Sequence, residues 1–333
     1  MWNLPVLPRV RQPRRIVIVT SGGDSPGMNP AIRAVVRSAI HCGIEVLGSD
    51  RGYTGLVEDE LRPMNTASVG NILHRGGTVL KSDRCDAFRE PTVRARVAQA
   101  LHKRGVEGLV VIGGDGSLTG AHLLAEETGF PVIGLPGTID NDIYGTADTI
   151  GFDTAVNTGL EAIDRIRDTA HSHERVFLVE VMGRSSGFIA LAVGLAGGAE
   201  SVLLPDCRID VPELVQRLNL SKRRGKNSSL IVVAEGHDPQ LTARLAGQLT
   251  EQGHQARACI LGHIQRGGSP TGHDRLLAST LGASAVDHLC ADKGDIMLGV
   301  QAGCIAAVPL RDVAGLRKPL PTGILDLARI LAT

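Results

Sequence analysis

Residues 16–29 read IVIVTSGGDSPGMN. This stretch opens with an apolar, β-branched run, Ile16–Val19, which predicts a buried strand. A turn with two adjacent glycines, Gly22 and Gly23, follows, and the pattern of Pro30–His41 then predicts a helix. Glycines at such a place let the backbone approach a ligand closely, and the first N–H groups of the helix can bind phosphate. A purely steric role in a tight turn is an equally good interpretation of this stretch alone.

The same unit recurs along the chain, because short apolar runs alternate with longer amphipathic segments. The further expected strands are Leu109–Ile112, Val132–Leu135, Val176–Val181, Val202–Leu204 and Leu230–Ala234, and the further expected helices are Val93–Arg104, Thr119–Glu127, Asp153–Thr169 and Pro212–Leu220. This alternation predicts an α/β fold with mostly parallel sheets, covered by helices on both faces. Ligands of such sheets bind at the carboxyl ends of the strands, so the turns just after strands are the expected site.

The chain has 333 residues, with 35 Lys and Arg against 35 Asp and Glu, so its formal net charge is zero. This length is typical of two domains or one large one. Zero net charge disfavours duplex DNA or an anionic membrane as a partner. Aromatic residues make up only 2% of the chain, which disfavours base-stacking surfaces for RNA. Glycine is the one clear excess, with 41 residues and no collagen period.

The cysteines are widely spaced, without a CxxC pair or a Cys/His cluster, so neither a disulfide framework nor a zinc site is expected. They are Cys42, Cys85, Cys207, Cys259, Cys290 and Cys304. Buried reduced thiols are the preferred interpretation. Residues 1–15 lack the apolar stretch of a secretory signal and are expected to be a short, poorly ordered extension. The weakly polar stretch Gly187–Ala199 is too short for a membrane span and predicts a buried helix. A soluble, cytoplasmic protein is expected.

A second glycine-rich turn, Gly113–Ser117 (GGDGS), follows the expected strand Leu109–Ile112. Its carboxylate, Asp115, would repel a phosphate unless a cation lies between them. Mg²⁺ binds one or two carboxylates together with phosphate oxygens, so the turn predicts a Mg²⁺–nucleotide site. The alternative is that Asp115 is a helix N-cap. Because Ser117 is better placed as the cap, we favour the metal site.

A third turn, Pro136–Asp142 (PGTIDND), follows the expected strand Val132–Leu135. Its two carboxylates, Asp140 and Asp142, suit a division of labour in which one accepts a proton from a hydroxyl and the other holds Mg²⁺. A solvated turn with Asp and Asn caps is the alternative, and for this turn alone it is the commoner outcome.

Two familiar nucleotide-binding motifs are absent. A Walker A loop needs a glycine before Lys-Ser, but Lys81 follows Leu80. The G-x-G-x-x-G fingerprint, counted from Gly114, meets Thr119 where its last glycine belongs. Neither a P-loop NTPase nor a Rossmann dehydrogenase is therefore supported.

Several basic residues lie near these turns or near strand ends and are candidates for binding a sugar phosphate. They are Arg84, Arg175, Arg184, Arg257 and Arg266. Arginine clamps phosphate in a bidentate way, although most arginines are solvated surface charges. Of the histidines, His263 is a candidate hydrogen-bond partner of a substrate, whereas the pair His171 and His173 lacks a third metal ligand and indicates a helix end or surface.

Taken together, the motifs resemble those of the bacterial-type 6-phosphofructokinases. The segments SGGDSPGMN, RGGT, GGDGS, PGTIDND, VMGR, AEG and LGHIQRGGSP occur in that family's order, from about Ile16 to about Ile305. The resemblance implies two three-layer α/β lobes, a homotetramer, and ATP-dependent phosphorylation of fructose 6-phosphate on O1. It divides the chain into an extension at 1–15, an ATP-binding lobe at 16–151 and 265–316, and a fructose 6-phosphate-binding lobe at 152–264 and 317–333.

The resemblance also implies roles for individual residues. The ATP site comprises Gly23, Arg84, Cys85, Gly114, Asp115, Gly116 and Ser117, and the Mg²⁺ ligands are Asp115 and Asp142. The substrate site comprises Thr138, Ile139, Asp140, Arg175, Met182, Gly183, Arg184, Glu235, Arg257, His263, Ile264, Gln265 and Arg266. Asp140 is the implied general base, and Thr138, Arg184, Gly23 and Arg84 are implied to assist catalysis. Arg175 and Arg257 are implied to reach the 6-phosphate across a subunit interface.

Gly116 and Gly137 bear on the phosphoryl donor, because pyrophosphate-using relatives carry Asp and Lys there; both glycines favour ATP. The nucleotide-effector site of the family is partly kept, in Arg33, Arg37, Arg167, Glu200 and Lys226. Thr66-Ala67 replaces an Arg-Tyr pair of that site, and Lys81 replaces a common glycine, so regulation is left open.

Three alternatives remain. A pyrophosphate-dependent phosphofructokinase is the nearest enzyme. NAD kinases and lipid kinases also use GGDG-type turns but leave PGTIDND and GHIQRGG unexplained. A catalytically silent sugar-phosphate sensor predicts a missing carboxylate, yet Asp115, Asp140 and Asp142 are all present.

Overall fold

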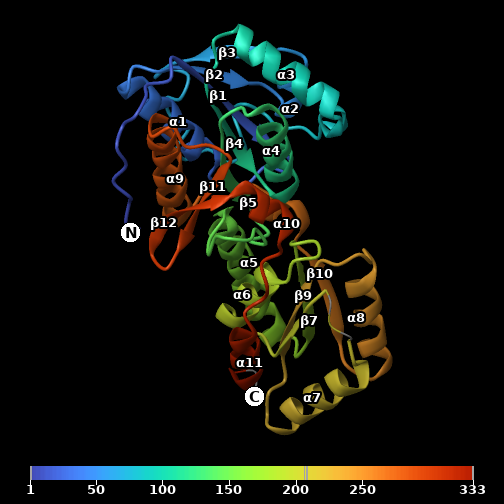
Figure 1. Ribbon diagram of the computed structural model, residues 1–333. Helices are drawn as coiled ribbons and strands as arrows, with labels where there is room; N and C mark the ends of the chain where they lie inside the picture. The colour runs from blue at the N-terminus through green and yellow to red at the C-terminus, as the bar shows by residue number, and fades with distance from the viewer. Residues whose placement is uncertain (1, 206, 208, 332–333) are drawn as a thin grey trace. The chain divides into compact units, whose positions relative to one another are not determined.

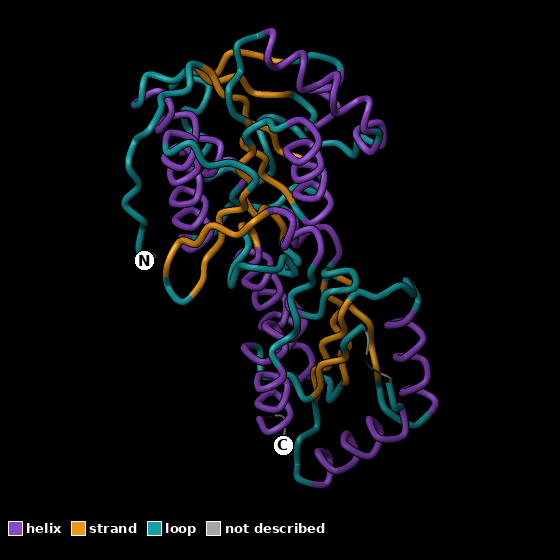
Figure 2. Tube along the Cα trace, viewed as in Figure 1, coloured by secondary structure: helices purple, strands orange, loops and turns teal. Residues whose placement is uncertain are grey.

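The computed structural model describes residues 2–205, 207 and 209–331, and within them the chain forms two compact units (Figure 1). The first unit contains the described residues up to Thr154 together with Arg266–Lys318. The second contains Ala155–Gln265 and the described residues from Pro319 onward. Each unit has its own sheet with helices against it, as the tube coloured by secondary structure shows (Figure 2). The α/β class with two mostly parallel sheets, predicted from the sequence, is confirmed.

The first unit is built on an eight-stranded sheet in the described part of the chain, in the order β12-β11-β5-β4-β1-β2-β3, with β6 paired to β5. The strands are β1 (Arg15–Ser21), β2 (Glu45–Ser49), β3 (Leu61–Met64), β4 (Leu109–Gly113), β5 (Val132–Thr138), β6 (Ile150–Gly151), β11 (Ile296–Gln301) and β12 (Cys304–Pro309). All pairs are parallel except β2–β3 and β11–β12. The sequence pattern did not predict β2, β3, β11 or β12.

Helices cover both faces of this sheet. They are α1 (Met28–His41), α2 (Tyr53–Val57), α3 (Pro91–Lys103), α4 (Asp115–Thr128), α9 (Gly272–Cys290) and α10 (Leu310–Gly315), with the 3₁₀ helix η1 (Asp86–Arg89). Alternate residues of β1 point to opposite faces, so Ile16 and Ile18 join the core under α1 and α9, whereas Val17 and Val19 join the core under α3 and α4. Burial on both faces explains why β1 reads as an unbroken apolar run.

The register of the strands brings the three predicted turns to the same side of the sheet, at the carboxyl ends of β1, β4 and β5. Ser21 of β1 lies opposite Gly113 of β4, and Gly113 lies opposite Pro136 of β5. The glycine turns that follow these strands therefore begin at the same level on three neighbouring strands.

The second unit has a four-stranded sheet among its described residues, in the order β10-β7-β9-β8, with every pair parallel. The strands are β7 (Val176–Val181), β8 (Ser201–Leu203), β9 (Ser229–Ala234) and β10 (Ala256–Ile260), and the helices are α5 (Phe152–Ser172), α6 (Phe188–Ala196), α7 (Val211–Arg223), α8 (Leu241–Glu251) and α11 (Thr322–Leu331), with the 3₁₀ helix η2 (Gly262–Arg266). Leucines from α7 and α8 bury one face of this sheet. The buried helix predicted within Gly187–Ala199 is confirmed as α6.

Two expectations from the sequence are wrong. The segment before β1 is not loosely attached: Asn3 forms a bridge with Cys304, and the N–H groups of Val10 and Arg11 bond to the carbonyl of Cys290 at 2.9 and 3.0 Å. Nor are the cysteines uniformly buried, since Cys207 and Cys304 are exposed.

Within the described residues, we find no helix with the combined length and apolarity needed to cross a membrane.

Candidate active site

The first glycine turn packs against the second. Gly22 has a φ of +83°, and a Cβ there would lie 3.1 Å from Oγ of Ser117. A Cβ on Gly113 would lie 2.6 Å from the carbonyl oxygen of Ser21 and 2.7 Å from Cβ of Ser117. The two turns thus meet through bare backbone, with the small Ser117 side chain filling the space between them. This close approach is the physical reason for glycine at both places.

Asp115 belongs to the helix rather than to a free turn. Helix α4 begins at Asp115, and its N-cap is Gly114 in an extended conformation, without a side-chain cap. The expectation that Ser117 caps this helix is wrong, because Ser117 is the third helical residue and its N–H bonds to the carbonyl of Gly114 at 3.0 Å. An acid in the first turn of a helix is stabilised by the helix dipole.

The carboxylates of Asp115 and Asp142 act on each other. Burial raises the pKa of Asp115, the negative charge of Asp142 raises it further, and the Arg317 guanidinium opposes both effects. Two oxygen donors of like charge, one exposed (Asp115) and one half-buried (Asp142), suit a hard divalent cation such as Mg²⁺, which needs few protein ligands when phosphates supply the rest. The described residues contain no cluster of three or more His, Cys, Asp or Glu side chains able to hold a metal.

Two cations beside these carboxylates were not predicted from the sequence. Arg317 bridges to Ile143 through its backbone, and Lys318 donates from Nζ to the carbonyl of Ala147 at 2.7 Å. Burial lowers the pKa of Lys318 to about 8, although Asp148 and Asp142 counteract it. Both residues lie between Leu316 and Pro319, outside the glycine-rich turns that were singled out, so no local pattern marked them.

Thr138 and Asp140 lie next to the second turn. Thr138 ends β5, and both side chains are only 8% exposed. The N–H of Asp140 donates to Oγ1 of Thr138 at 3.2 Å, and Oγ1 of Thr149 donates to the carbonyl of Thr138 at 2.7 Å. A Cβ on Gly114 would lie 3.6 Å from Cβ of Thr138. Thr138 therefore lies against the Gly113–Ser117 turn, and the backbone of Asp140 is hydrogen-bonded to Thr138.

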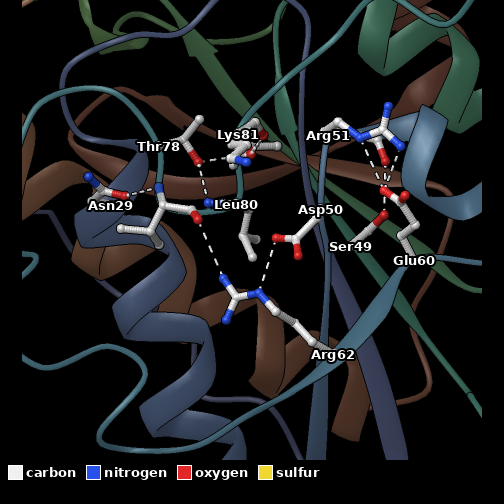
Figure 3. A network of polar contacts seen from close by, with 12 residues as sticks. Asn29, Ser49, Asp50, Arg51, Glu60, Arg62, Thr78, Leu80 and Lys81 are labelled. Carbon is white, nitrogen blue, oxygen red and sulfur yellow. Dashed lines mark hydrogen bonds and ion pairs between the residues drawn. The ribbon is translucent and has the colours of Figure 1, made fainter.

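The segment that leads to Arg84 and Cys85 is tied to β1 and α1 (Figure 3). Oγ1 of Thr20 donates to the carbonyl of Lys81 at 2.7 Å and lies 2.9 Å from Oγ1 of Thr78. The amide of Asn29 accepts from the N–H of Val79 at 2.8 Å. These bonds place the chain just before Arg84 at the end of β1.

Asn29 also donates to the carbonyls of Arg75 and Gly76, at 3.0 and 3.2 Å, and so fixes the RGGT segment to the start of α1. Figure 3 also shows ion pairs that border this network, between Arg62 and Asp50 and between Arg51 and Glu60. Arg84 itself is exposed and Cys85 is half-buried.

In the second unit, Glu235 organises the residues that follow two neighbouring strands. Val181 of β7 pairs with Ala234 of β9, so their carboxyl ends coincide. Oε2 of Glu235 accepts from the N–H groups of Gly183 and Arg184 at 3.3 and 3.0 Å. Arg184 has a φ of +49°, a strained conformation for a side chain of its size, and the carboxylate stabilises that turn.

Gln265 supports the same turn from inside the unit. Its side chain is fully buried; Oε1 accepts from the N–H of Met182 at 2.8 Å and Nε2 donates to the carbonyl of Ala155 at 3.1 Å. Gln265 therefore holds Met182 in place and has no exposed side chain to offer a ligand, which differs from the direct contact expected for it. His263 and Ile264 lie beside it in η2, just after β10, and the Ile264 side chain is 61% exposed.

Arg175 and Arg257 lie at the amino-terminal ends of the strands of this sheet, opposite the carboxyl ends that carry Arg184 and Glu235. Arg175 directly precedes β7, and Arg257 is the second residue of β10, opposite Phe177. The six residues of β7 separate these amino-terminal ends from the turn that contains Arg184 by roughly 20 Å. Within one copy of the second unit, these two arginines therefore do not join Arg184 and Glu235 around one phosphate.

The effector-site residues are divided between the units. Arg33 and Arg37 lie on α1 of the first unit. In the second unit, Nζ of Lys226 forms an ion pair with Oε1 of Glu200 at 2.5 Å, and Arg167 donates to the carbonyl of Gly197.

The fold and this set of turns define the phosphofructokinase family, and the chain belongs to it: residues 15–289 match the family described as Phosphofructokinase. The chain is 53% identical over 320 residues to ATP-dependent 6-phosphofructokinase 1 of Thermus thermophilus, covering 96% of this chain and 99% of that protein. It is 50% identical to the ATP-dependent 6-phosphofructokinase of Brevibacillus brevis, with the same coverage. The resemblance inferred from the motifs is confirmed.

Solved structures agree. Phosphofructokinase from Saccharomyces cerevisiae has a TM-score of 0.85 and 36% sequence identity, covering 96% of this chain and 48% of the yeast chain, so the present chain spans about half of that longer one. A pyrophosphate-dependent phosphofructokinase from Marinobacter aquaeolei has a TM-score of 0.82 at 24% identity, covering 93% of this chain and 86% of the other. That second likeness concerns the fold alone.

Proposed function

We propose that this chain is an ATP-dependent 6-phosphofructokinase, which transfers the γ-phosphate of ATP to O1 of fructose 6-phosphate and yields fructose 1,6-bisphosphate and ADP. The observation that carries the proposal is the alignment of Ser21, Gly113 and Pro136 on three neighbouring strands. It supports a site in which backbone that phosphate can approach and the buried carboxylate of Asp140 act together. The activity in the names of relatives that are 50–53% identical along almost the whole chain supports the same conclusion.

The first unit binds the donor. Its backbone at Gly23 and Gly114–Ser117 binds phosphate oxygens, and Arg84 and Cys85 border the nucleotide. Asp115 and Asp142 hold Mg²⁺, which, when bound, neutralises charge on the phosphates and orients the transferred group.

Asp140 is the general base. It accepts the O1 proton of the sugar as the hydroxyl attacks, and the bond to Thr138 fixes its backbone. A buried carboxylate next to the phosphate-binding turn suits this role, because phosphoryl transfer depends on in-line placement and on a base near the attacking oxygen. Ile139, fully buried, anchors the segment between them.

The second unit binds the acceptor. Arg184 contacts the sugar phosphate, and Glu235 and His263 bind its hydroxyl groups; Met182, Gly183 and Ile264 shape the surface. Arg266 is a further proposed substrate ligand.

Arg175 and Arg257 act on the 6-phosphate of a neighbouring subunit in a homotetramer. Their place at the amino-terminal ends of their strands, away from Arg184, supports this, since an arginine there is available to another copy of the chain. The cytoplasmic location expected from the sequence stays a prediction.

The surroundings of Gly116 support ATP as the donor. A Cβ at Gly116 would meet nothing within 4 Å, so this position opens onto space that a nucleotide can use. Gly137 carries less information about the donor, because a Cβ there would lie 2.9 Å from Cγ2 of Ile112 and packing alone requires glycine.

A coupled assay tests the proposal directly: fructose 6-phosphate with Mg²⁺ is supplied with ATP in one arm and with pyrophosphate in the other. Turnover with ATP alone is the expected result. Turnover with pyrophosphate alone would reassign the donor, and binding of both substrates without turnover would indicate a silent sensor.

A further inference from the structure

Helices α1 and α9 run side by side in the same direction (Figure 1). Near their start, a Cβ on Gly27 would lie 3.6 Å from Cβ of Asp274. About two turns further along, a Cβ on Gly282 would lie 2.8 Å from Cβ of Ala34. The two helices therefore pack in parallel with matching positions along their lengths, and a glycine at each contact allows their close approach.

This parallel arrangement brings two cysteines to the same level. Cys42 caps the carboxyl end of α1, and Cys290 is the last residue of α9. The chain runs nearly the same number of residues from Gly27 to Cys42 as from Asp274 to Cys290, so the two thiols end up together. The side chains also interact: burial raises the pKa of the Cys290 thiol, and the Cys42 side chain, hydrogen-bonded to it, raises it further.

The segment Arg9–Gln12 lies across both cysteines. Nη2 of Arg9 donates to Sγ of Cys42 at 3.3 Å, and Nε2 of Gln12 donates to the carbonyl of Cys42 at 2.6 Å. The two residues between them donate their N–H groups to the carbonyl of Cys290 at 2.9 and 3.0 Å. This segment thus contacts both cysteines and places a cation beside the Cys42 sulfur, while Cys42 stays partly exposed.

The two sulfurs differ in access and in surroundings. Cys42 is partly exposed and next to the Arg9 guanidinium, whereas Cys290 is buried. The thiolate is the reactive form of cysteine, and the Arg9 guanidinium favours that form at Cys290 by opposing the rise in its pKa. The pair therefore combines an accessible sulfur that meets the oxidant with a protected sulfur that resolves the product.

We propose that Cys42 and Cys290 form a reversible intramolecular disulfide when the protein meets hydrogen peroxide. The Cys42 thiolate attacks one peroxide oxygen and the O–O bond breaks, so that a sulfenic acid forms and the leaving hydroxide takes up the proton released by the Cys42 thiol to become one water. The Cys290 sulfur then attacks the Cys42 sulfur; the S–S bond forms, and the hydroxyl leaves as a second water with the Cys290 proton. The two thiols are oxidised by two electrons and the peroxide is reduced to two waters.

The disulfide joins the carboxyl ends of two helices that are distant in sequence, so it restricts the unfolded chain and stabilises the first unit. A thiol reductant reverses the reaction by exchange. This inference does not depend on the proposed function.

The test uses the full-length protein. It is treated with hydrogen peroxide, the remaining peroxide is removed with catalase, and the protein is then denatured and alkylated. Mass mapping is expected to show a peptide that links Cys42 to Cys290, the loss of two alkylation sites per chain, and their return after dithiothreitol. The oxidised protein is expected to unfold at a higher temperature than the reduced protein.

Three kinds of variant sharpen the test. C42S and C290S are each expected to abolish the linked peptide, whereas C207S, at an exposed cysteine, keeps it. R9A is expected to slow thiol loss several-fold without changing its extent. Full alkylation of Cys290 after oxidation, or a cross-link between chains through Cys304 in its place, would overturn the proposal.

Discussion

The Arg266 guanidinium lies directly on the backbone of Gly23, since a Cβ at position 23 would be 2.8 Å from Nη1 of Arg266. The same nitrogen donates to the carbonyl of Asp24 at 3.3 Å, from a residue 242 positions later in the chain. The proposed phosphate-binding turn and the proposed substrate-binding arginine thus share one contact.

This contact predicts the effect of Gly23→Ala. The obstructing atom is the end of a flexible side chain, so the fold tolerates the methyl group, but Arg266 must move away. We expect the melting temperature to stay near the wild-type value and kcat/KM for fructose 6-phosphate to fall about tenfold or more, on the scale of a lost charge-assisted hydrogen bond. Gly247→Ala, where a Cβ meets nothing within 4 Å, is the control. Unchanged kinetics of G23A would contradict the shared role.

Asp140→Ser removes the proposed base at a buried position with little change in volume elsewhere. Turnover is expected to fall by about 10²–10⁴-fold, the usual loss of a general base, while the far-UV circular dichroism spectrum and the affinity for ATP stay near wild type. The kinetic measurement is kcat at saturating substrates. Near-normal kcat would rule out Asp140 as the base.

Gly116 and Gly137 separate a ligand effect from a packing effect. Gly116→Asp points a carboxylate into open space, so the variant should fold normally but show a strongly raised KM for ATP. Gly137→Ala adds a methyl group 2.9 Å from Ile112 and 3.2 Å from Cε of Met28, and overpacking of this kind costs about 1–3 kcal/mol of stability. Urea unfolding and ATP titration of both variants check this; the opposite assignment of effects would refute it.

Glu235 is expected to act through the turn that it holds. Glu235→Ala removes the acceptor of the Gly183 and Arg184 N–H groups, and Glu235→Gln keeps an oxygen there. We expect KM for fructose 6-phosphate to rise by about tenfold or more in E235A, and less in E235Q, with KM for ATP unchanged in both. Equal KM values in the two variants would argue against the positioning role.

Lys318 predicts a pH dependence of stability. Its pKa falls from 10.5 to about 8 on folding. Between these values the unfolded chain binds more protons than the folded chain, so the free energy of unfolding rises with pH in that window. Relative to Lys318→Met, the wild type should therefore gain stability from pH 8 to pH 10 in urea unfolding. A difference that does not change with pH would show that Lys318 is not desolvated in the folded protein.

Much of this architecture could be predicted from the sequence, because buried parallel strands such as Ile16–Val19 read as unbroken apolar runs. The antiparallel edge strand β3 (Leu61–Met64) could not, since it has only four residues, with Arg62 and Pro63 in its middle. Which turns become neighbours was also hidden: the pairing of Ser21 with Gly113 is set by strand order, which local pattern does not encode.

The sequence singled out Asp115 and Asp140 because residue type and chemistry coincide there, and their roles stay predictions. Residues whose role depends on burial could not be interpreted from the sequence. Gln265 looks like a ligand in its glycine-rich motif, but it is a fully buried support, and Lys318 has no motif at all. The attachment of residues 3–12 depends on contacts with Cys290 and Cys304, nearly the whole chain away.

The division of the chain has a consequence for its synthesis. The core under α1 needs Leu277, Leu281 and Leu298, which are translated after the whole sheet of the second unit. On the ribosome, the second unit can assemble its sheet from Ser201–Ile260 and the preceding β7 while the first unit still lacks α9 and β11. We therefore expect the amino-terminal half to emerge early, remain incomplete with an exposed apolar face, and depend on chaperones until the last third of the chain is released.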